Sequence, residues 1–120
     1  MSARIDGLGV ALIEVPRLER ALRRFGARLE SRLFSRSEIQ YARRGRRPAE
    51  RLAARLAAKL ALRRAVFPPP RISAIEVVRD EAGSPALRWP GSGPRVRAHL
   101  SLSHADGLAL ACVWLESGAG

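Results

Sequence analysis

Few side chains in this sequence can take part in chemistry, and His104 is the best placed of them. It ends the alternating segment 97–104 on the same side as Leu102, and an imidazole has a pKa near neutrality, which suits a general acid or base. Ser101 and Ser103 fall on the other side, and no neighbouring acid completes a nucleophilic triad. We interpret His104 as either an acid/base group or a structural histidine, with neither favoured.

The positive charge of the chain is concentrated in one segment. Residues 17–64 hold 16 of the 22 basic residues and four of the 11 acidic ones, within a formal net charge of +11. A surface this basic attracts an anionic partner. We do not expect nucleic acid, because the chain has few aromatic side chains for stacking on bases and no known docking motif.

Length and composition predict a single globular domain over residues 1–120. The chain is 47% hydrophobic and 28% charged, which is typical of a folded domain. No apolar run approaches the roughly 20 residues of a membrane span, so no membrane association is expected. One cysteine, Cys112, excludes an intrachain disulfide and, with two histidines, leaves no standard zinc-ligand set. We expect a cytoplasmic protein without a bound metal.

The N-terminal part of the chain predicts a strand followed by a helix. Residues 4–15 read as a strand, in which Gly7 and Gly9 indicate a bend or a close approach of another backbone. Pro16 then begins a helix with an apolar stripe on one face and arginines on another. The stripe comprises Leu18, Leu22, Phe25 and Leu29, and the arginines are Arg17, Arg20, Arg24 and Arg28.

Two more helices are expected before residue 70. Ser35 and Glu38 form a capping box that begins a short helix over 35–42. The longest helix runs from Pro48 to about Val66, where a run of prolines ends it. Its leucine row, which we expect to fill the core, is Leu52, Leu56 and Leu60, and its parallel basic row is Arg51, Arg55, Lys59 and Arg63.

The C-terminal half predicts strands over 72–79, 86–89, 97–104 and 107–115, with a turn at 80–85. The fold class is therefore α+β. We expect an antiparallel sheet with helices, including the long helix 48–66, packed on one face.

Three segments together resemble the holo-acyl-carrier-protein synthase family, the small 4′-phosphopantetheinyl transferases. Residues 7–14 (GLGVALIE) are similar to the family's G-x-G-x-D-[IL]-x-E strand, and residues 55–61 (RLAAKLA) to R-F-A-A-K-E-A on its long helix. Residues 99–104 (HLSLSH) are similar to its H-[VL]-S-[IL]-[ST]-H strand. The order and spacing also match, and the resemblance spans nearly the whole chain.

The resemblance implies a 4′-phosphopantetheinyl transferase-like fold and a homotrimer with sites between protomers. Family members move the phosphopantetheine arm of coenzyme A onto a serine of an acyl carrier protein, with a magnesium ion held by the aspartate of the first motif and the glutamate of the second. Here Ala11 and Leu60 stand at those positions, and neither side chain has an oxygen for magnesium. We therefore expect no magnesium, whereas coenzyme A or its phosphopantetheine arm stays possible as a ligand.

The resemblance also implies roles for other residues. Glu14 survives from the first motif and is, with His104, a candidate catalytic residue. Arg55, Lys59 and Arg64 are candidates for substrate binding, together with an apolar pocket formed by Ala11 and Leu60. For Lys59 and Arg64 we weigh an exposed position without a role. Arg17, Arg24 and Arg28 match the helix with which the family binds the acidic helix of a carrier protein.

Three functions remain open from the sequence. The first is a relative that binds an acyl or peptidyl carrier protein but has lost magnesium-dependent transfer. It would act as an accessory protein, or perform dehydration or cyclisation on a tethered acyl or polyketide chain through His104. The second is a still-active 4′-phosphopantetheinyl transferase. The third is a structural subunit of a mixed trimer.

Overall fold

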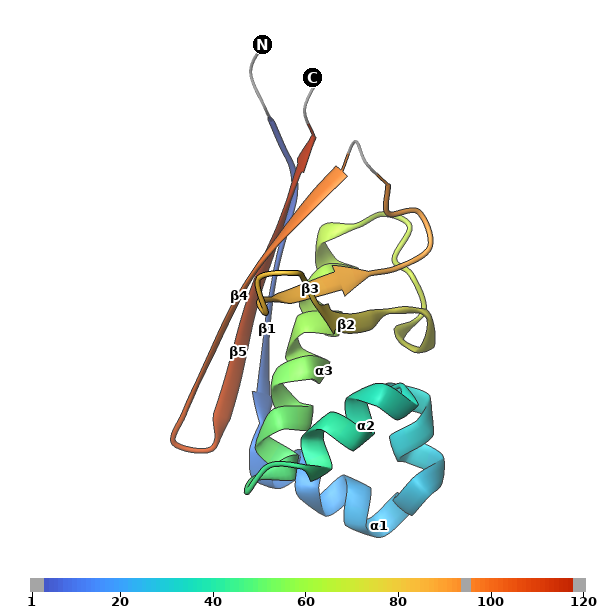
Figure 1. Ribbon diagram of the computed structural model, residues 1–120, viewed down its shortest axis with the longest axis vertical. Coiled ribbons are helices and arrows are strands. Elements are labelled where there is room, and N and C mark those ends of the chain that lie inside the picture. Colours follow the sequence, from blue (N-terminus) through green and yellow to red (C-terminus); the bar gives the residue numbers. More distant parts are fainter. Residues whose placement is uncertain (1–3, 94–95, 118–120) are drawn as a thin grey trace.

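The computed structural model describes residues 4–93 and 96–117, and its central element is a three-stranded antiparallel sheet. The strands are β1 (Arg4–Glu14), β4 (Val96–Ala105) and β5 (Leu108–Ser117), arranged in the order β1-β5-β4. Figure 1 shows them as a long, twisted layer along one side of the molecule. The predicted strands at both ends of the chain are confirmed, and they form one sheet because β5 pairs with both neighbours.

Helix α3 (Pro48–Ala65) crosses one face of this sheet, as predicted, and the other helices lie on the same side (Figure 1). Gly7 and Gly9 permit the contact. A Cβ atom at Gly7 would lie 2.0 Å from the carbonyl oxygen of Ala65, and one at Gly9 would lie 1.9 Å from that of Ala61. The two glycines therefore mark the close backbone approach that the sequence indicated, and only residues without a side chain fit there.

Helices α1 (Val15–Leu33) and α2 (Arg36–Arg43) pack beside the N-terminal half of α3. The capping box that begins α2 is present as predicted, with Ser35 and Glu38 bonded to each other's backbone N–H. The predicted apolar stripe of α1 is wrong at Phe25, whose side chain is 59% exposed. The reason is Gly26, whose φ of 64° interrupts the helix and changes the direction of the next turn.

The predicted strands of residues 72–89 form a separate hairpin rather than part of the main sheet. Strands β2 (Glu76–Arg79) and β3 (Pro85–Arg88) pair only with each other among the described residues, after a short 3-10 helix at Ile72–Ala74. The expectation of a single sheet is therefore wrong, although the α+β class is confirmed. Figure 1 shows this hairpin on the α3 side of the main sheet.

The core lies on the α3 side of the main sheet, in two buried clusters, and Ile13, Leu60 and Leu102 pack against both. Leu52 and Leu56 are buried and Leu60 is half-buried against both clusters, so the leucine row fills the core as expected. None of the helices over the described residues is long and apolar enough to cross a membrane.

Candidate functional site

A basic cavity of about 670 Å³ opens where α3, the segment before it and the end of β4 meet. We call it the arginine cavity. Four arginines contribute to its lining, against a single carboxylate, so its walls carry a net positive charge that suits an anionic ligand. Its lining residues are Tyr41, Arg46, Arg47, Glu50, Arg51, Ala54, Arg55, Leu102 and His104.

Arg55 is the most unusual residue of this cavity. It is only 8% exposed, and its guanidinium lies over the ring of Tyr41 at 4.1 Å from the ring centroid. Burial lowers the pKa of Arg55. Its Nε is the one buried side-chain donor without a hydrogen-bond partner over residues 4–93 and 96–117. A buried charged donor of this kind is costly unless an acceptor satisfies it, so an anionic ligand would stabilise this arrangement.

Tyr41 is the common neighbour of three arginines. Arg51 and Arg79 lie 4.6 Å and 4.8 Å from its ring centroid, in addition to Arg55, and Arg79 donates a hydrogen bond to the phenolic oxygen. Burial acts to raise the pKa of Tyr41, but the hydrogen bond from Arg79 and the three positive charges outweigh it and lower that pKa. Tyr41 therefore contacts two arginines of the cavity, Arg51 and Arg55, and one outside it, Arg79.

His104 lies at the rim of the cavity and is oriented by Glu50. Its Nδ1 is 2.7 Å from a carboxylate oxygen of Glu50, and its side chain is 55% exposed. When the proton of the neutral ring is on Nδ1, beside the Glu50 carboxylate, Nε2 is left as an acceptor. This is the arrangement that a general base needs, with a carboxylate fixing the ring and the other nitrogen open to a substrate.

The sequence did not single out Glu50, Tyr41, Arg46 or Arg47. The sequence contained a weak indication of a role for Arg46 and Arg47, because they belong to the basic link before α3. It contained no indication for Glu50, since its partner His104 lies on a strand far along the chain. The pairing exists only because β4 ends beside the first turn of α3.

Lys59 occupies a different position from the one the sequence suggested. It is 1% exposed, and its ammonium donates hydrogen bonds to Glu38 at 2.6 Å and to the carbonyl of Leu33 at 2.8 Å. Burial lowers the pKa of Lys59, while Glu38 acts in the opposite direction. Of the two interpretations of Lys59, the exposed position without a role is therefore wrong. Lys59 is a buried ion-pair partner and does not line the arginine cavity.

Ala11 and Leu60 do not form the apolar pocket that we expected. Ala11 is 2% exposed and belongs to the core cluster under α3, whereas Leu60 packs between the two clusters. Neither residue lines the arginine cavity. The reason is that β1 and α3 touch at Gly9, two residues before Ala11. The two apolar side chains therefore fill the space between the strand and the helix and leave no pocket there.

Arg64 contacts the middle of β1, and Glu14 is the last residue of that strand. Arg64 is exposed on the last turn of α3 and donates a hydrogen bond to the carbonyl of Val10, next to Ala11. Glu14 is 63% exposed and lies 3.9 Å from Arg17 at the start of α1. Glu14 and His104 thus come from neighbouring ends of the sheet, but Glu14 does not line the arginine cavity.

The three arginines proposed for partner binding are exposed on α1, as predicted. Arg17, Arg24 and Arg28 all have exposed side chains, and Arg24 lies over the ring of the exposed Phe25 at 5.3 Å from the centroid. Arg28 follows the interruption of the helix at Gly26, whereas Arg17 and Arg24 precede it.

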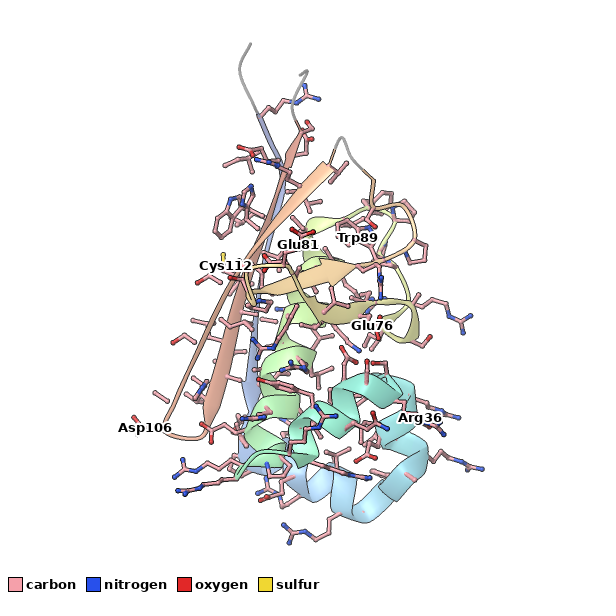
Figure 2. All side chains as sticks on the ribbon, in the orientation of Figure 1. Arg36, Glu76, Glu81, Trp89, Asp106 and Cys112 are labelled. Atoms are coloured by element: carbon pink, nitrogen blue, oxygen red, sulfur yellow. The ribbon has the colours of Figure 1, made fainter. Side chains whose placement is uncertain are left out.

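The second face of the main sheet, which we call the outer sheet face, is apolar over β1 and β5 and polar over β4. Its side chains point away from α3, as Cys112 does in Figure 2. It carries Leu8, Val10, Leu12, Leu108, Leu110, Cys112 and Trp114, of which the first five are exposed.

Comparison with known proteins identifies the family. No family model matches the chain. A holo-[acyl-carrier-protein] synthase of Koribacter versatilis is 36% identical over 93% of this chain and 98% of its own length. Its counterpart in Thermus thermophilus is 43% identical over 96% of each chain.

A crystal structure of a holo-(acyl-carrier-protein) synthase from Bacillus anthracis in complex with CoA (3′,5′-ADP) is also similar. It is 34% identical, covers 95% of this chain and 98% of its own, and superposes with a TM-score of 0.77. These findings confirm the resemblance of the three motifs and the fold that it implied. The chain belongs to the holo-[acyl-carrier-protein] synthase family.

Proposed function

We propose that this protein transfers the 4′-phosphopantetheine arm of coenzyme A to a serine of an acyl carrier protein. The observation that carries the proposal is the arginine cavity, with the unpartnered buried Arg55 at its base and the oriented His104 at its rim. The names of its relatives and the coenzyme A complex of one of them support the same reading. Of the functions left open by the sequence, active transfer is therefore favoured over loss of activity.

The geometry assigns roles to the residues of the site. Arg55, and Arg64 near β1, bind the phosphates of coenzyme A, because a guanidinium donates paired hydrogen bonds to phosphate oxygens. Nε2 of His104 accepts the proton of the carrier serine. The serine oxygen forms a bond to the phosphorus that carries the pantetheine arm, the pyrophosphate P–O bond breaks, and 3′,5′-ADP leaves with the electron pair.

The family implies a magnesium ion for this reaction, but the residues of this chain do not fit it. Magnesium needs several oxygen ligands, and the side chains at the two implied positions, Ala11 and Leu60, are hydrocarbon and packed in the core. No step of the proposed reaction is therefore routed through a metal.

An intact-mass assay tests the transfer. The protein is incubated with coenzyme A and an apo acyl carrier protein, with and without magnesium, and the carrier protein is weighed. We expect it to gain the mass of one phosphopantetheine group, and a His104→Gln variant to slow the gain by about 100-fold or more. A carrier protein that stays unmodified in both buffers contradicts the proposal.

Exposed arginines on α1 form the proposed docking surface for the carrier protein. Arg17, Arg24 and Arg28 present positive charge to an acidic helix, and such contacts act mainly on the association rate at low salt. An Arg24→Glu variant should bind the carrier protein at least about tenfold more weakly in a low-salt titration. The matched control is Arg97→Glu, an exposed arginine at the start of β4, whose pairing with β5 places it at the end of the main sheet opposite to α1, and it should bind normally.

The outer sheet face supports a homotrimer. Exposed apolar side chains of β1 and β5 make a contiguous patch that is costly to leave in water. We propose that three copies of the chain cover it together. Sedimentation equilibrium should give three times the monomer mass, and a monomer at micromolar concentration would contradict the assembly.

The apolar junction at Ala11 and Leu60 favours one other candidate function, a carrier-binding protein without transferase activity. In that case the protein acts as an accessory subunit, or uses His104 in a dehydration or cyclisation of a tethered acyl chain. The two candidates separate in one experiment, because both predict binding of the carrier protein and only the first predicts its change in mass.

A further inference from the structure

We propose that this chain binds the phosphate groups of its ligand without a divalent metal, and that arginine side chains at the β1–α3 junction and in the arginine cavity supply the positive charge instead. The identity of the ligand as coenzyme A rests on the proposed function. The absence of a metal site rests on the residues of the junction themselves.

The junction offers a metal no ligand. Ala11 contributes a methyl group that is 2% exposed among Ala57, Ala58 and Ala61 of α3, and Leu60 contributes an isobutyl group between the two core clusters. A Cβ at Gly9 would already lie 1.9 Å from the carbonyl oxygen of Ala61, so the two backbones touch beside Ala11. Over residues 4–93 and 96–117, no three His, Cys, Asp or Glu side chains are grouped closely enough to hold a metal.

Glu14 does not replace the missing ligands. Successive side chains of a strand point to opposite faces, so Glu14 shares the outer side of β1 with Leu12 rather than the inner side with Ala11. Its carboxylate is 63% exposed and lies 3.9 Å from the guanidinium of Arg17. The acid that survives from the first motif is therefore directed away from the junction.

Arg64 brings a positive charge to the edge of this junction. It follows Leu60 by four residues, which places both on one face of α3. Its Nη1 donates a hydrogen bond to the carbonyl of Val10, the residue before Ala11. The hydrogen bond holds the guanidinium on β1, and the remaining N–H groups are donors that suit phosphate oxygens.

The unpartnered Nε of Arg55 is a second, independent observation that calls for an acceptor. It lies in a cavity whose arginines outnumber its single carboxylate, Glu50. A phosphate ligand would satisfy the buried donor and neutralise the cavity. Arg55 and Arg64 are nine residues apart on α3, about 13 Å along the helix, so they act on different phosphate groups of the ligand. Together these two anion sites take over the charge compensation that a metal would provide.

Calorimetric titration of the wild-type protein with coenzyme A, in EDTA and in magnesium chloride, tests the inference. We expect dissociation constants within about twofold of each other. Titration of Mn²⁺ as a probe, followed by electron paramagnetic resonance in the presence of coenzyme A, should show no protein-bound ion. Binding that tightens tenfold or more with magnesium, or a tightly bound Mn²⁺, overturns the inference and leaves the proposed function standing.

Two variants extend the test. Arg64→Ala should weaken coenzyme A binding by about 10- to 100-fold in both buffers, whereas Arg71→Ala should not change it.

The double substitution Ala11→Asp with Leu60→Glu should create Mn²⁺ binding, and its neutral control, Ala11→Asn with Leu60→Gln, should not. The wild-type titrations decide the inference even if a junction variant does not fold. A wild-type protein that binds no coenzyme A in either buffer overturns both the inference and the proposed function.

Discussion

A single buried carboxylate, that of Glu38, connects three elements of this protein. It accepts hydrogen bonds from the backbone N–H of Ser35 at 2.7 Å, from Lys59 of α3 at 2.6 Å and from the backbone N–H of Val77 in β2 at 2.8 Å. Both side chains of the ion pair are 1% exposed. A charge buried to this degree is tolerated only when it is paired and hydrogen-bonded. The ion pair therefore fixes where the hairpin β2–β3 meets the helices.

Removing the ammonium of this pair should destabilise the protein strongly. A Lys59→Met variant leaves the carboxylate of Glu38 buried without its charge partner, which costs about 3–5 kcal/mol of unfolding free energy. Urea denaturation followed by circular dichroism measures the change. Arg36→Met, on the exposed face of α2, is the control and should stay within about 0.5 kcal/mol of wild type. A loss below about 1 kcal/mol for Lys59→Met would show that the pair is not important for stability.

Tyr41 is the only tyrosine of the chain, so its titration can be followed directly by ultraviolet absorbance. Burial opposes ionisation, but the hydrogen bond from Arg79 and the nearby arginine charges lower its pKa. We expect a midpoint below that of free tyrosine, at about 10, and a shift back towards this value in Arg79→Ala. An unchanged midpoint in the variant would contradict the assigned cause.

The same shift has a consequence for stability. Because the phenol has a lower pKa in the folded protein than in the unfolded chain, its contribution to stability is fully present above the unfolded value of about 10. That contribution is lost as the pH falls through the folded pKa. The folded protein should therefore gain stability from this group as the pH rises between the two values.

At the scale of the elements, the contact between β1 and α3 decides the geometry of the site. Gly7 and Gly9 allow the strand and the helix to touch, and this contact brings Arg64 of α3 to the carbonyl of Val10. The other end of α3 lies near the end of β4, where Glu50 meets His104. One helix therefore carries residues of both proposed anion sites.

A Gly9→Ala substitution should disturb this contact. Its Cβ would lie 1.9 Å from the backbone oxygen of Ala61, which cannot rotate away, so the strand and the helix must separate. Overpacking of this kind costs about 1–3 kcal/mol or more, and the measured thermal unfolding midpoint should fall. Gly93→Ala is the matched control, because a Cβ there meets no atom within 4 Å. Equal midpoints for the two variants would contradict the close contact.

At the scale of the whole molecule, one face of the main sheet is covered and the other is not. Figure 1 shows all the helices and the hairpin β2–β3 on the side of α3. The outer sheet face keeps large apolar side chains in water in the single chain, among them Leu8, Leu12 and Leu110. Small domains rarely leave such a patch uncovered. We therefore expect other copies of this chain to cover the outer sheet face.

A charge placed on this face should break the assembly. Leu110→Lys introduces an ammonium into the centre of the outer sheet face, where burial between copies would be costly. We expect the sedimentation mass to fall from trimer to monomer and the thermal midpoint to become independent of protein concentration. Arg97→Ala, which removes an exposed side chain on the same face of β4, is the milder control. An unchanged trimer in Leu110→Lys would show that the copies meet elsewhere.

The sequence alone determined what depends on local spacing. The capping box at Ser35, the proline that begins α3, the leucine row and the alternation in β4 each follow from residues a few positions apart, because helices and strands have fixed periods. The three sequence motifs also indicated the family of the protein. The concentration of positive charge in residues 17–64 was also evident from the sequence.

Tertiary structure decided which charges are buried and which residues meet. Lys59 and Arg55 belonged to one basic row in the sequence, yet one is an ion-pair partner and the other lies at the base of a cavity. Their partners, and those of His104 and Arg64, lie on other elements, 21 positions away for Lys59 and 54 for Arg64. Contacts over such separations arise only when the sheet and α3 pack, because no periodicity of the chain encodes them.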